Sequence, residues 1–134
     1  MTDWVKDIRD MHSYYGVHNA IKDFDKEKLE KLIDFRIDFL EEELTELKDN
    51  RRNPEEVVDA LIDLCVVAIG TLDLYGVDAH AAWYEVLDAN MNKTPGVKAS
   101  RPNPLGLPDL IKPEGWTAPS HEGNHGTLTL IKED

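Results

Sequence analysis

The chain lacks any apolar run close to the roughly 20 residues that a helix needs to cross a bilayer. It has a single cysteine, Cys65, which excludes an internal disulfide and is typical of proteins in a reducing compartment. Its first residues lack the charged-then-apolar pattern of a secretory signal. From these absences we expect a cytoplasmic protein.

Basic residues are scarce, with 15 lysines and arginines against 27 aspartates and glutamates, and the formal net charge is −12. A surface of this sign repels the phosphate backbone of nucleic acids, so we expect no nucleic-acid partner. A nucleotide substrate is not excluded, because a bound divalent cation can reverse the local electrostatic field.

Proline is rare in the first part of the chain, where apolar residues recur at helical spacing. The 134 residues suffice for one domain with a core. Thr2 is the expected cap of the first helix. Asn53 followed by Pro54 is a strong start for the third helix. The third helix is apolar on nearly every side, so we expect it to be the most buried. The pattern predicts an all-α, four-helix bundle, with helices over residues 2–15, 25–50, 53–75 and 78–93 and a connection over 17–24.

Composition changes near residue 95, because five of the seven prolines follow Gly96 and the helical periodicity ends. We predict a helical core over residues 1–95 and an irregular C-terminal arm over residues 96–134, both within one domain. Residues 127–131 are compatible with a short strand. The sequence assigns no role to His121 and His125 in this arm.

Acidic residues occupy the second predicted helix at positions that its periodicity assigns to the inner face. Arg36 and Glu43 interrupt an otherwise leucine-rich stripe. Glu46 lies one turn after Glu43, and Glu42 stands beside it, which produces the pattern Glu42-Glu43-x-x-Glu46.

The third predicted helix carries a second line of acids, Glu56, Asp59 and Asp63, at spacing i, i+3, i+7. A short loop makes the two helices antiparallel neighbours, and burying unpaired carboxylates is costly. Carboxylate ligands suit Mg²⁺ or Mn²⁺ rather than zinc. The pattern therefore predicts a site for hard divalent cations.

Two simpler interpretations compete with a metal site. The run of glutamates from residue 41 to 46 could be a solvated face, and Glu56 could serve only as the capping partner of Asn53. Asp59 and Asp63 favour the metal interpretation, because their helix offers little polar surface.

The two acidic motifs, Glu42-Glu43-x-x-Glu46 and Glu56-x-x-Asp59, resemble the all-α NTP pyrophosphatase superfamily. Its branches include MazG, HisE-type phosphoribosyl-ATP pyrophosphohydrolases, dCTP pyrophosphatases and dimeric dUTPases.

The resemblance extends over residues 7–95. Residues 7–12 are similar to the family's first helix, which carries a base-contacting histidine, and residues 88–95 are similar to its closing Asn/Lys segment. The arm after Pro95 resembles those of phage-encoded members, which implies a viral origin and action in a host cytoplasm.

The resemblance implies roles for the acids. Glu42, Glu46 and Lys93 would be catalytic, with Glu42 helping to hold a second ion or to activate water. A site would contain two or more Mg²⁺ ions, with Mn²⁺ as a substitute. The principal metal ligands would be Glu43, Glu46, Glu56 and Asp59.

It also implies substrate contacts. Asn90 and Lys93 would face the phosphates, and His12 would lie against the base. The arm has no counterpart in the family's core, and its basic residues Lys98, Arg101 and Lys112 could either close over the triphosphate or pack against a neighbouring subunit.

The implied activity is hydrolysis of a nucleoside triphosphate to monophosphate and pyrophosphate, with the leaving charge held by metal and by Lys93 or Arg36. A carboxylate at Asp63 could accept two hydrogen bonds from guanine, which makes dGTP or GTP the preferred substrate. Asp63 could equally bind metal or pair with Arg36. Phosphoribosyl-ATP, dCTP and dUTP are the alternative substrates.

Two other classes of function remain open. The protein could be a non-catalytic acidic interaction module, or a structural dimer joined through its third helix. The family's sites form in oligomers, so we expect a homodimer or homotetramer in either event, and no membrane partner.

Overall fold

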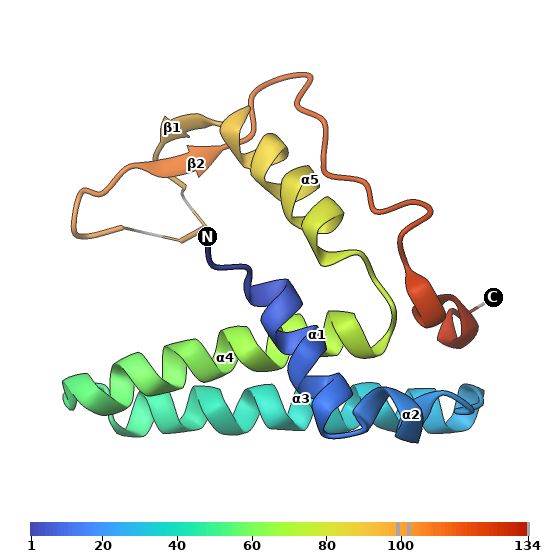
Figure 1. Ribbon diagram of the computed structural model, residues 1–134. Helices are drawn as coiled ribbons and strands as arrows, with labels where there is room; N and C mark the ends of the chain where they lie inside the picture. Colours follow the sequence, from blue (N-terminus) through green and yellow to red (C-terminus); the bar gives the residue numbers. More distant parts are fainter. Residues whose placement is uncertain (99, 102, 134) are drawn as a thin grey trace. The chain divides into compact units, whose positions relative to one another are not determined.

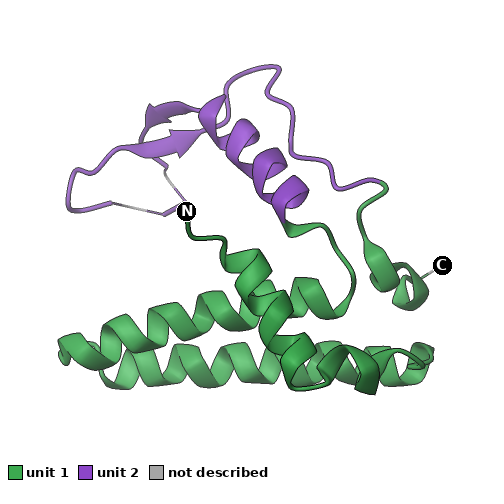
Figure 2. Cartoon of the chain, viewed as in Figure 1, with its two compact units in different colours: residues 1–79, 123–134 green, residues 80–122 purple. Residues whose placement is uncertain are grey.

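The computed structural model describes residues 1–98, 100–101 and 103–133. The chain is mostly helical (Figure 1), which confirms the predicted all-α class. It divides into two compact units, coloured separately in Figure 2. One unit contains Met1–Ala79 and Gly123–Asp134, and the other contains His80–Glu122. The predicted grouping of residues 1–95 and 96–134 as parts of one domain stays a prediction.

The first unit is built on a helical hairpin. Helices α3 and α4 lie side by side, and α1 packs on α4 (Figure 1). The short helix α2 contacts α1, and the 3₁₀ helix η1 contacts α3. The elements of this unit are α1 (Trp4–Tyr14), α2 (Val17–Ile21), α3 (Lys26–Asp49), α4 (Pro54–Leu74) and η1 (Gly126–Ile131).

The starts of the two long helices follow from local hydrogen bonding. The side chain of Asp25 accepts a hydrogen bond from the backbone N–H of Lys28 at 3.0 Å. Asn53 accepts one from the N–H of Glu56 at 3.3 Å, with Pro54 in the first helical position. Each cap satisfies a backbone donor that the first helical turn leaves unpaired, as the sequence predicted.

The cap predicted for the first helix was wrong by one residue. Asp3, not Thr2, caps α1, and its carboxylate accepts from the backbone N–H of Lys6 at 3.0 Å. An aspartate also places negative charge at the positive end of the helix dipole, which a threonine does not.

Two segments differ from the predicted connections. Residues 17–24, expected to be a connection, begin with the helix α2. Residues 127–131, considered as a strand, lie in η1 instead. There the backbone N–H of Thr127 donates to the carbonyl of Tyr75 at 2.8 Å. A Cβ at Gly126 would overlap that carbonyl, so the close approach requires glycine.

The core of the first unit lies where α3 and α4 meet. Tyr75 is completely buried, and its hydroxyl donates to the carbonyl of Leu29 at 2.6 Å. Leu29, Val67 and Leu74 are also buried. The hydrogen bond satisfies the one polar atom of the tyrosine side chain, so its large ring can be buried without a desolvation penalty.

Helix α4 has the most buried residues of the helices in the first unit, as the sequence predicted, but part of its apolar surface is open to solvent in the single chain. Its inner residues Ala60 and Val67 are buried, but Val58, Leu61 and Ile62 are exposed. None of the helices in the described residues combines the length and the hydrophobicity that a membrane span requires.

The second unit contains almost all of α5 (Ala79–Met91) and a two-stranded antiparallel sheet. Strand β1 (Thr94–Gly96) pairs with β2 (Asp109–Ile111), so the segment predicted to be irregular has a short regular pairing. The indole N–H of Trp116 donates to the carbonyl of Ala89 at 2.8 Å and joins the segment after β2 to α5.

Candidate functional site

A buried glutamate marks the centre of the candidate site. Glu43 on α3 is only 8% exposed, and its Oε2 atom has no hydrogen-bond partner among the described residues. A carboxylate oxygen in this condition has lost its water without gaining a donor, which costs free energy. Such an atom is suited to contact a cation that the chain itself does not supply.

Further carboxylates lie near Glu43 on both helices. Glu46 follows one turn along α3, and Asp63 comes from the neighbouring α4, where Asp59 interacts with it. Asp63 is half-buried, but Glu46 and Asp59 are exposed, so the expectation that the helix buries Asp59 was wrong. Burial, together with the nearby charges of Glu46 and Asp63, raises the pKa of Glu43 above its ordinary value. Burial and the adjacent Asp59 likewise raise the pKa of Asp63. We call Glu43, Glu46, Asp59 and Asp63 the acidic cluster.

The acidic cluster differs in one member from the predicted metal ligands. Asp63, predicted as a base-reading residue, interacts with Glu43 and Asp59. Glu56, predicted as a ligand, is exposed in the first turn of α4, where Asn53 caps its backbone N–H. Glu42 is exposed beside the cluster and adds to the rise in the pKa of Glu43. The ligand roles of Glu43, Glu46, Glu56 and Asp59 stay predictions.

The donor set of the acidic cluster fits Mg²⁺ or Mn²⁺. It offers only carboxylate oxygens, which these hard ions prefer, and no thiolate or imidazole that would favour zinc. Burial is the first cause of the two raised pKa values, and bound cations would offset the repulsion among the acids that adds to it. Glu43 is the least exposed of the four acids, so water screens its charge least and a bound cation would stabilise it most.

Arg36, predicted to hold substrate phosphate, connects α3 to α4. Its Nε donates to the hydroxyl of Thr71 and its Nη2 to the carbonyl of Val67, both at 2.9 Å. Burial lowers the pKa of Arg36 below its ordinary value. A Cβ at Gly70 would lie 2.7 Å from Nη2, so this glycine leaves room for the guanidinium. The contact with pyrophosphate stays a prediction.

A second polar cluster joins α1, α2 and α4. His12 Nδ1 and His18 Nε2 each lie 2.7 Å from the same oxygen of Asp73. Burial raises the pKa of Asp73, but the hydrogen bonds and charges of the two histidines outweigh it and lower that pKa below its ordinary value. Ser13 Oγ lies 3.0 Å from the other ring nitrogen of His18. We call His12, His18 and Asp73 the histidine cluster.

The histidine cluster could also bind a metal ion, because one donor atom from each residue lies within 4.8 Å of the others. Two imidazoles and one carboxylate suit transition metals such as zinc. Without a metal, the hydrogen bonds already satisfy Asp73. His12 is buried here, with only 7% of its surface exposed, and its predicted contact with the base stays a prediction.

The other predicted substrate residues belong to the second unit. Lys93 lies with its Nζ 5.2 Å from the centre of the Trp116 ring, and Lys112 lies 5.1 Å from it. Asn90 is half-buried near the end of α5. Arg101 forms an ion pair with Asp109, at 2.8 Å.

The roles predicted for these residues towards phosphate stay predictions. So does that of Lys98, whose carbonyl accepts from the backbone N–H of Arg101 at 3.2 Å.

Sequence reasoning missed His18 and Asp73. His18 stood in a segment predicted to be a connection, and Asp73 stood near the end of an apolar helix. They are 55 residues apart, so no local spacing connected them. The available signal was a polar residue in an apolar segment, the same signal that pointed to Arg36, Glu43, Asp59 and Asp63.

Comparison with known proteins agrees with the acidic motifs. The family model described as phosphoribosyl-ATP pyrophosphohydrolase matches residues 17–90, which is more than half of the chain and includes both the α3 and the α4 acids. No curated protein sequence matches the chain. This match places the fold in the all-α MazG-like superfamily, whose members hydrolyse the acid anhydride bonds of nucleotides. The chain belongs to the phosphoribosyl-ATP pyrophosphohydrolase family.

Proposed function

We propose that the protein is a Mg²⁺-dependent nucleoside triphosphate pyrophosphohydrolase that releases a nucleoside monophosphate and pyrophosphate. The observation that carries this proposal is the acidic cluster, in which the buried Glu43 has an oxygen without a hydrogen-bond partner among the described residues. Family membership supports the class of reaction, and the all-oxygen donor set supports the class of metal.

The chain's own residues would hold cation and substrate in place. Glu43, Glu46, Asp59 and Asp63 would bind the cations, and Glu56 would join them if its side chain turned inward. When bound, Mg²⁺ supplies positive charge for the phosphates and lowers the pKa of water. Glu42, exposed beside the cluster, would accept the proton of the attacking water.

The proposed reaction is a single displacement at the α-phosphorus. The oxygen of water forms a bond to the α-phosphorus, and the bond from that phosphorus to the bridging oxygen breaks. Pyrophosphate leaves with the bond electrons, and the proton passes to Glu42. Lys93 would offset the charge of the leaving group.

For the substrate we propose dGTP or GTP. Asp63, which we predicted to contact guanine, lies beside Asp59 and is also available to a cation, so we look for a second residue that could recognise the base. Phosphoribosyl-ATP is the second candidate, because the matching family bears its name. dCTP and dUTP remain further alternatives. A homodimer or homotetramer, a cytoplasmic location and a phage origin also stay predictions.

The test incubates the purified protein and Mg²⁺ with each nucleoside triphosphate and with phosphoribosyl-ATP, in water enriched in ¹⁸O. Anion-exchange chromatography and mass spectrometry then identify the products. We expect monophosphate that carries ¹⁸O, unlabelled pyrophosphate, and loss of turnover on chelation. Label in the pyrophosphate would contradict attack at the α-phosphorus. No turnover of any of these substrates would contradict the proposal and favour an interaction module.

A further inference from the structure

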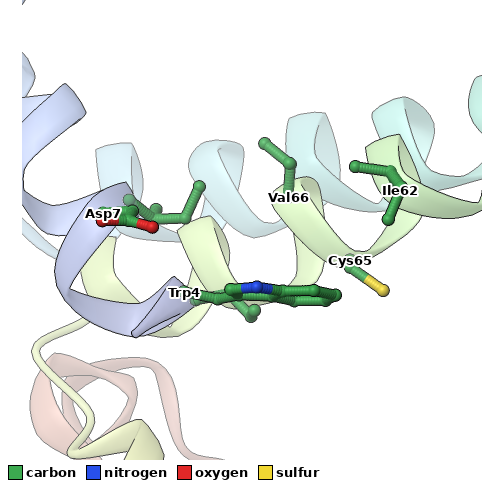
Figure 3. A pocket seen from close by; sticks show the side chains of 7 residues that line it. Trp4, Asp7, Ile62, Cys65 and Val66 are labelled. Atoms are coloured by element: carbon green, nitrogen blue, oxygen red, sulfur yellow. The ribbon is translucent and has the colours of Figure 1, made fainter. Parts of the chain in front are cut away.

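A small apolar pocket lies between α1 and α4, outside the acidic cluster. Its volume is about 200 Å³. Figure 3 shows the Trp4 indole edge-on, extending towards Cys65, with Ile62 and Val66 projecting from α4. Asp7 of α1 is the only charged residue that lines it. The pocket therefore combines a flat aromatic surface, aliphatic walls and one carboxylate.

The pocket begins next to the acidic cluster. Ile62, on its α4 wall, directly precedes Asp63, and Val66 follows Asp63 by less than one helical turn. Consecutive residues on a helix project about 100° apart. The pocket and the cluster therefore occupy adjacent faces of α4, as the base and phosphates of one nucleotide require.

We propose that this pocket holds the base of the nucleotide, and that Asp7 selects guanine. The assignment rests on the proposed hydrolase function, and it places the guanine contact on Asp7 instead of Asp63. Pockets for drug-sized ligands occupy roughly 300–1,000 Å³, so a smaller pocket suits one planar base with its sugar and phosphates outside.

The chemistry of the two α1 residues matches a guanine base. Trp4 is 51% exposed, so its indole is accessible to a ligand, and stacking on an aromatic ring is favourable for every base. The Asp7 carboxylate presents two acceptor oxygens and no donor. Guanine presents two adjacent donors, N1–H and the exocyclic amine, whereas adenine presents one donor next to an acceptor.

Cys65 provides a direct measure of occupancy, because it lines the pocket and is the chain's single cysteine. The rate of its alkylation by iodoacetamide is measured on the intact protein, with dGMP, dAMP or pyrophosphate added. We expect dGMP to slow alkylation at least about fivefold, dAMP to act only at higher concentration, and pyrophosphate alone to have no effect.

Two results would overturn the assignment. One is an unchanged rate at dGMP concentrations that saturate binding in calorimetry, or no dGMP binding at all. The other is a Cys65 thiol that reacts slowly without nucleotide and faster when the protein is diluted. This result would mean that a second copy of the chain covers the pocket.

Matched variants test the two contacts. Asp7→Asn is compared with Asp10→Asn, an exposed acid on the same helix that pairs with Lys6. Dissociation constants are measured for dGMP and for dIMP, which lacks the exocyclic amine. We expect Asp7→Asn to weaken dGMP about tenfold and dIMP much less, and Asp10→Asn to change neither. Equal losses for the two nucleotides in Asp7→Asn would contradict a guanine contact.

Trp4→Ala is compared with Trp4→Phe and with Tyr14→Ala, an exposed aromatic of α1 that does not line the pocket. We expect only Trp4→Ala to lose affinity for all bases, while phenylalanine restores most of it. Nucleotide binding at Cys65 without hydrolysis would contradict the proposed function alone. Hydrolysis without protection of Cys65 would contradict the pocket assignment alone.

Discussion

Asp63 and Asp73 stand on the same helix, yet their surroundings shift the two pKa values in opposite directions. Asp63 faces other carboxylates, and burial together with Asp59 raises its pKa. Asp73 is also shielded from water, but two histidines hydrogen-bond to it and its pKa falls. Two histidines therefore balance the charge of Asp73, whereas the groups that act on Asp63 in this comparison are other acids.

The comparison separates an acid with hydrogen-bond donors around it from one with other acids around it. A buried carboxylate with donors around it is already stable and holds helices together. A group of buried carboxylates without donors destabilises the fold until a cation arrives. We therefore infer metal binding from missing partners rather than from the number of acids.

The largest expected effect is on catalysis. Asp59→Asn and Glu46→Gln each remove a charged donor from the acidic cluster, and we expect kcat/KM to fall at least about 100-fold, since each 1.36 kcal/mol of lost transition-state stabilisation is a factor of ten. The control is Glu41→Gln, an exposed acid of α3 outside the cluster. Full activity in Asp59→Asn and Glu46→Gln would show that the cluster is not the active site.

The second effect is on stability in the presence of metal. Mg²⁺ at a hundred times its dissociation constant raises the free energy of unfolding by about 2.7 kcal/mol if one site binds only the folded chain. Denaturant titrations with Mg²⁺ and with chelator measure this difference. In Glu43→Gln we expect the difference to shrink and the metal-free protein to gain stability. A loss of metal-free stability in this variant would argue against an unpaired charge.

The third effect concerns the histidine cluster. Asp73→Ala removes both hydrogen bonds and leaves His12 buried without its acceptor, so we expect a loss of about 2 kcal/mol in the free energy of unfolding. Asp38→Ala, at an exposed position on α3, is the control. The stabilisation by Mg²⁺ should persist in Asp73→Ala. Its disappearance would mean that the two clusters form one functional unit.

The smallest effect is the dependence of stability on pH. The folded pKa of Glu43 lies above its unfolded value, so its contribution to stability is fully present below about 4.5, the ordinary glutamate pKa, and is lost as the pH rises through the folded pKa. Asp73 behaves oppositely, and its contribution is lost as the pH falls through its lowered folded pKa. Unfolding of metal-free protein between pH 5 and 8 isolates the first contribution, which Glu43→Gln should remove. If the pH profile of Glu43→Gln were the same as that of the unchanged protein, Glu43 would not be the source of this pH dependence.

Local features of this protein could be predicted from the sequence. The caps at Asp25 and Asn53 each bond to a backbone N–H three residues later, so neighbours in the chain decide them. The α-helical class and the acidic motifs on α3 and α4 also follow from short-range periodicity, because residues three or four apart share a helix face.

Tertiary structure alone decided which acids have partners. His12 bonds to Asp73 across 61 residues, and Gly126 approaches Tyr75 from the far end of the chain. The periodicity put Glu56, Asp59 and Asp63 on one line of the helix. Packing left Glu56 and Asp59 exposed and placed the half-buried Asp63 near Glu43. The physical reason is that the charge state of a buried acid depends on the nearest donors in space. Those donors come from helices that are distant in the sequence.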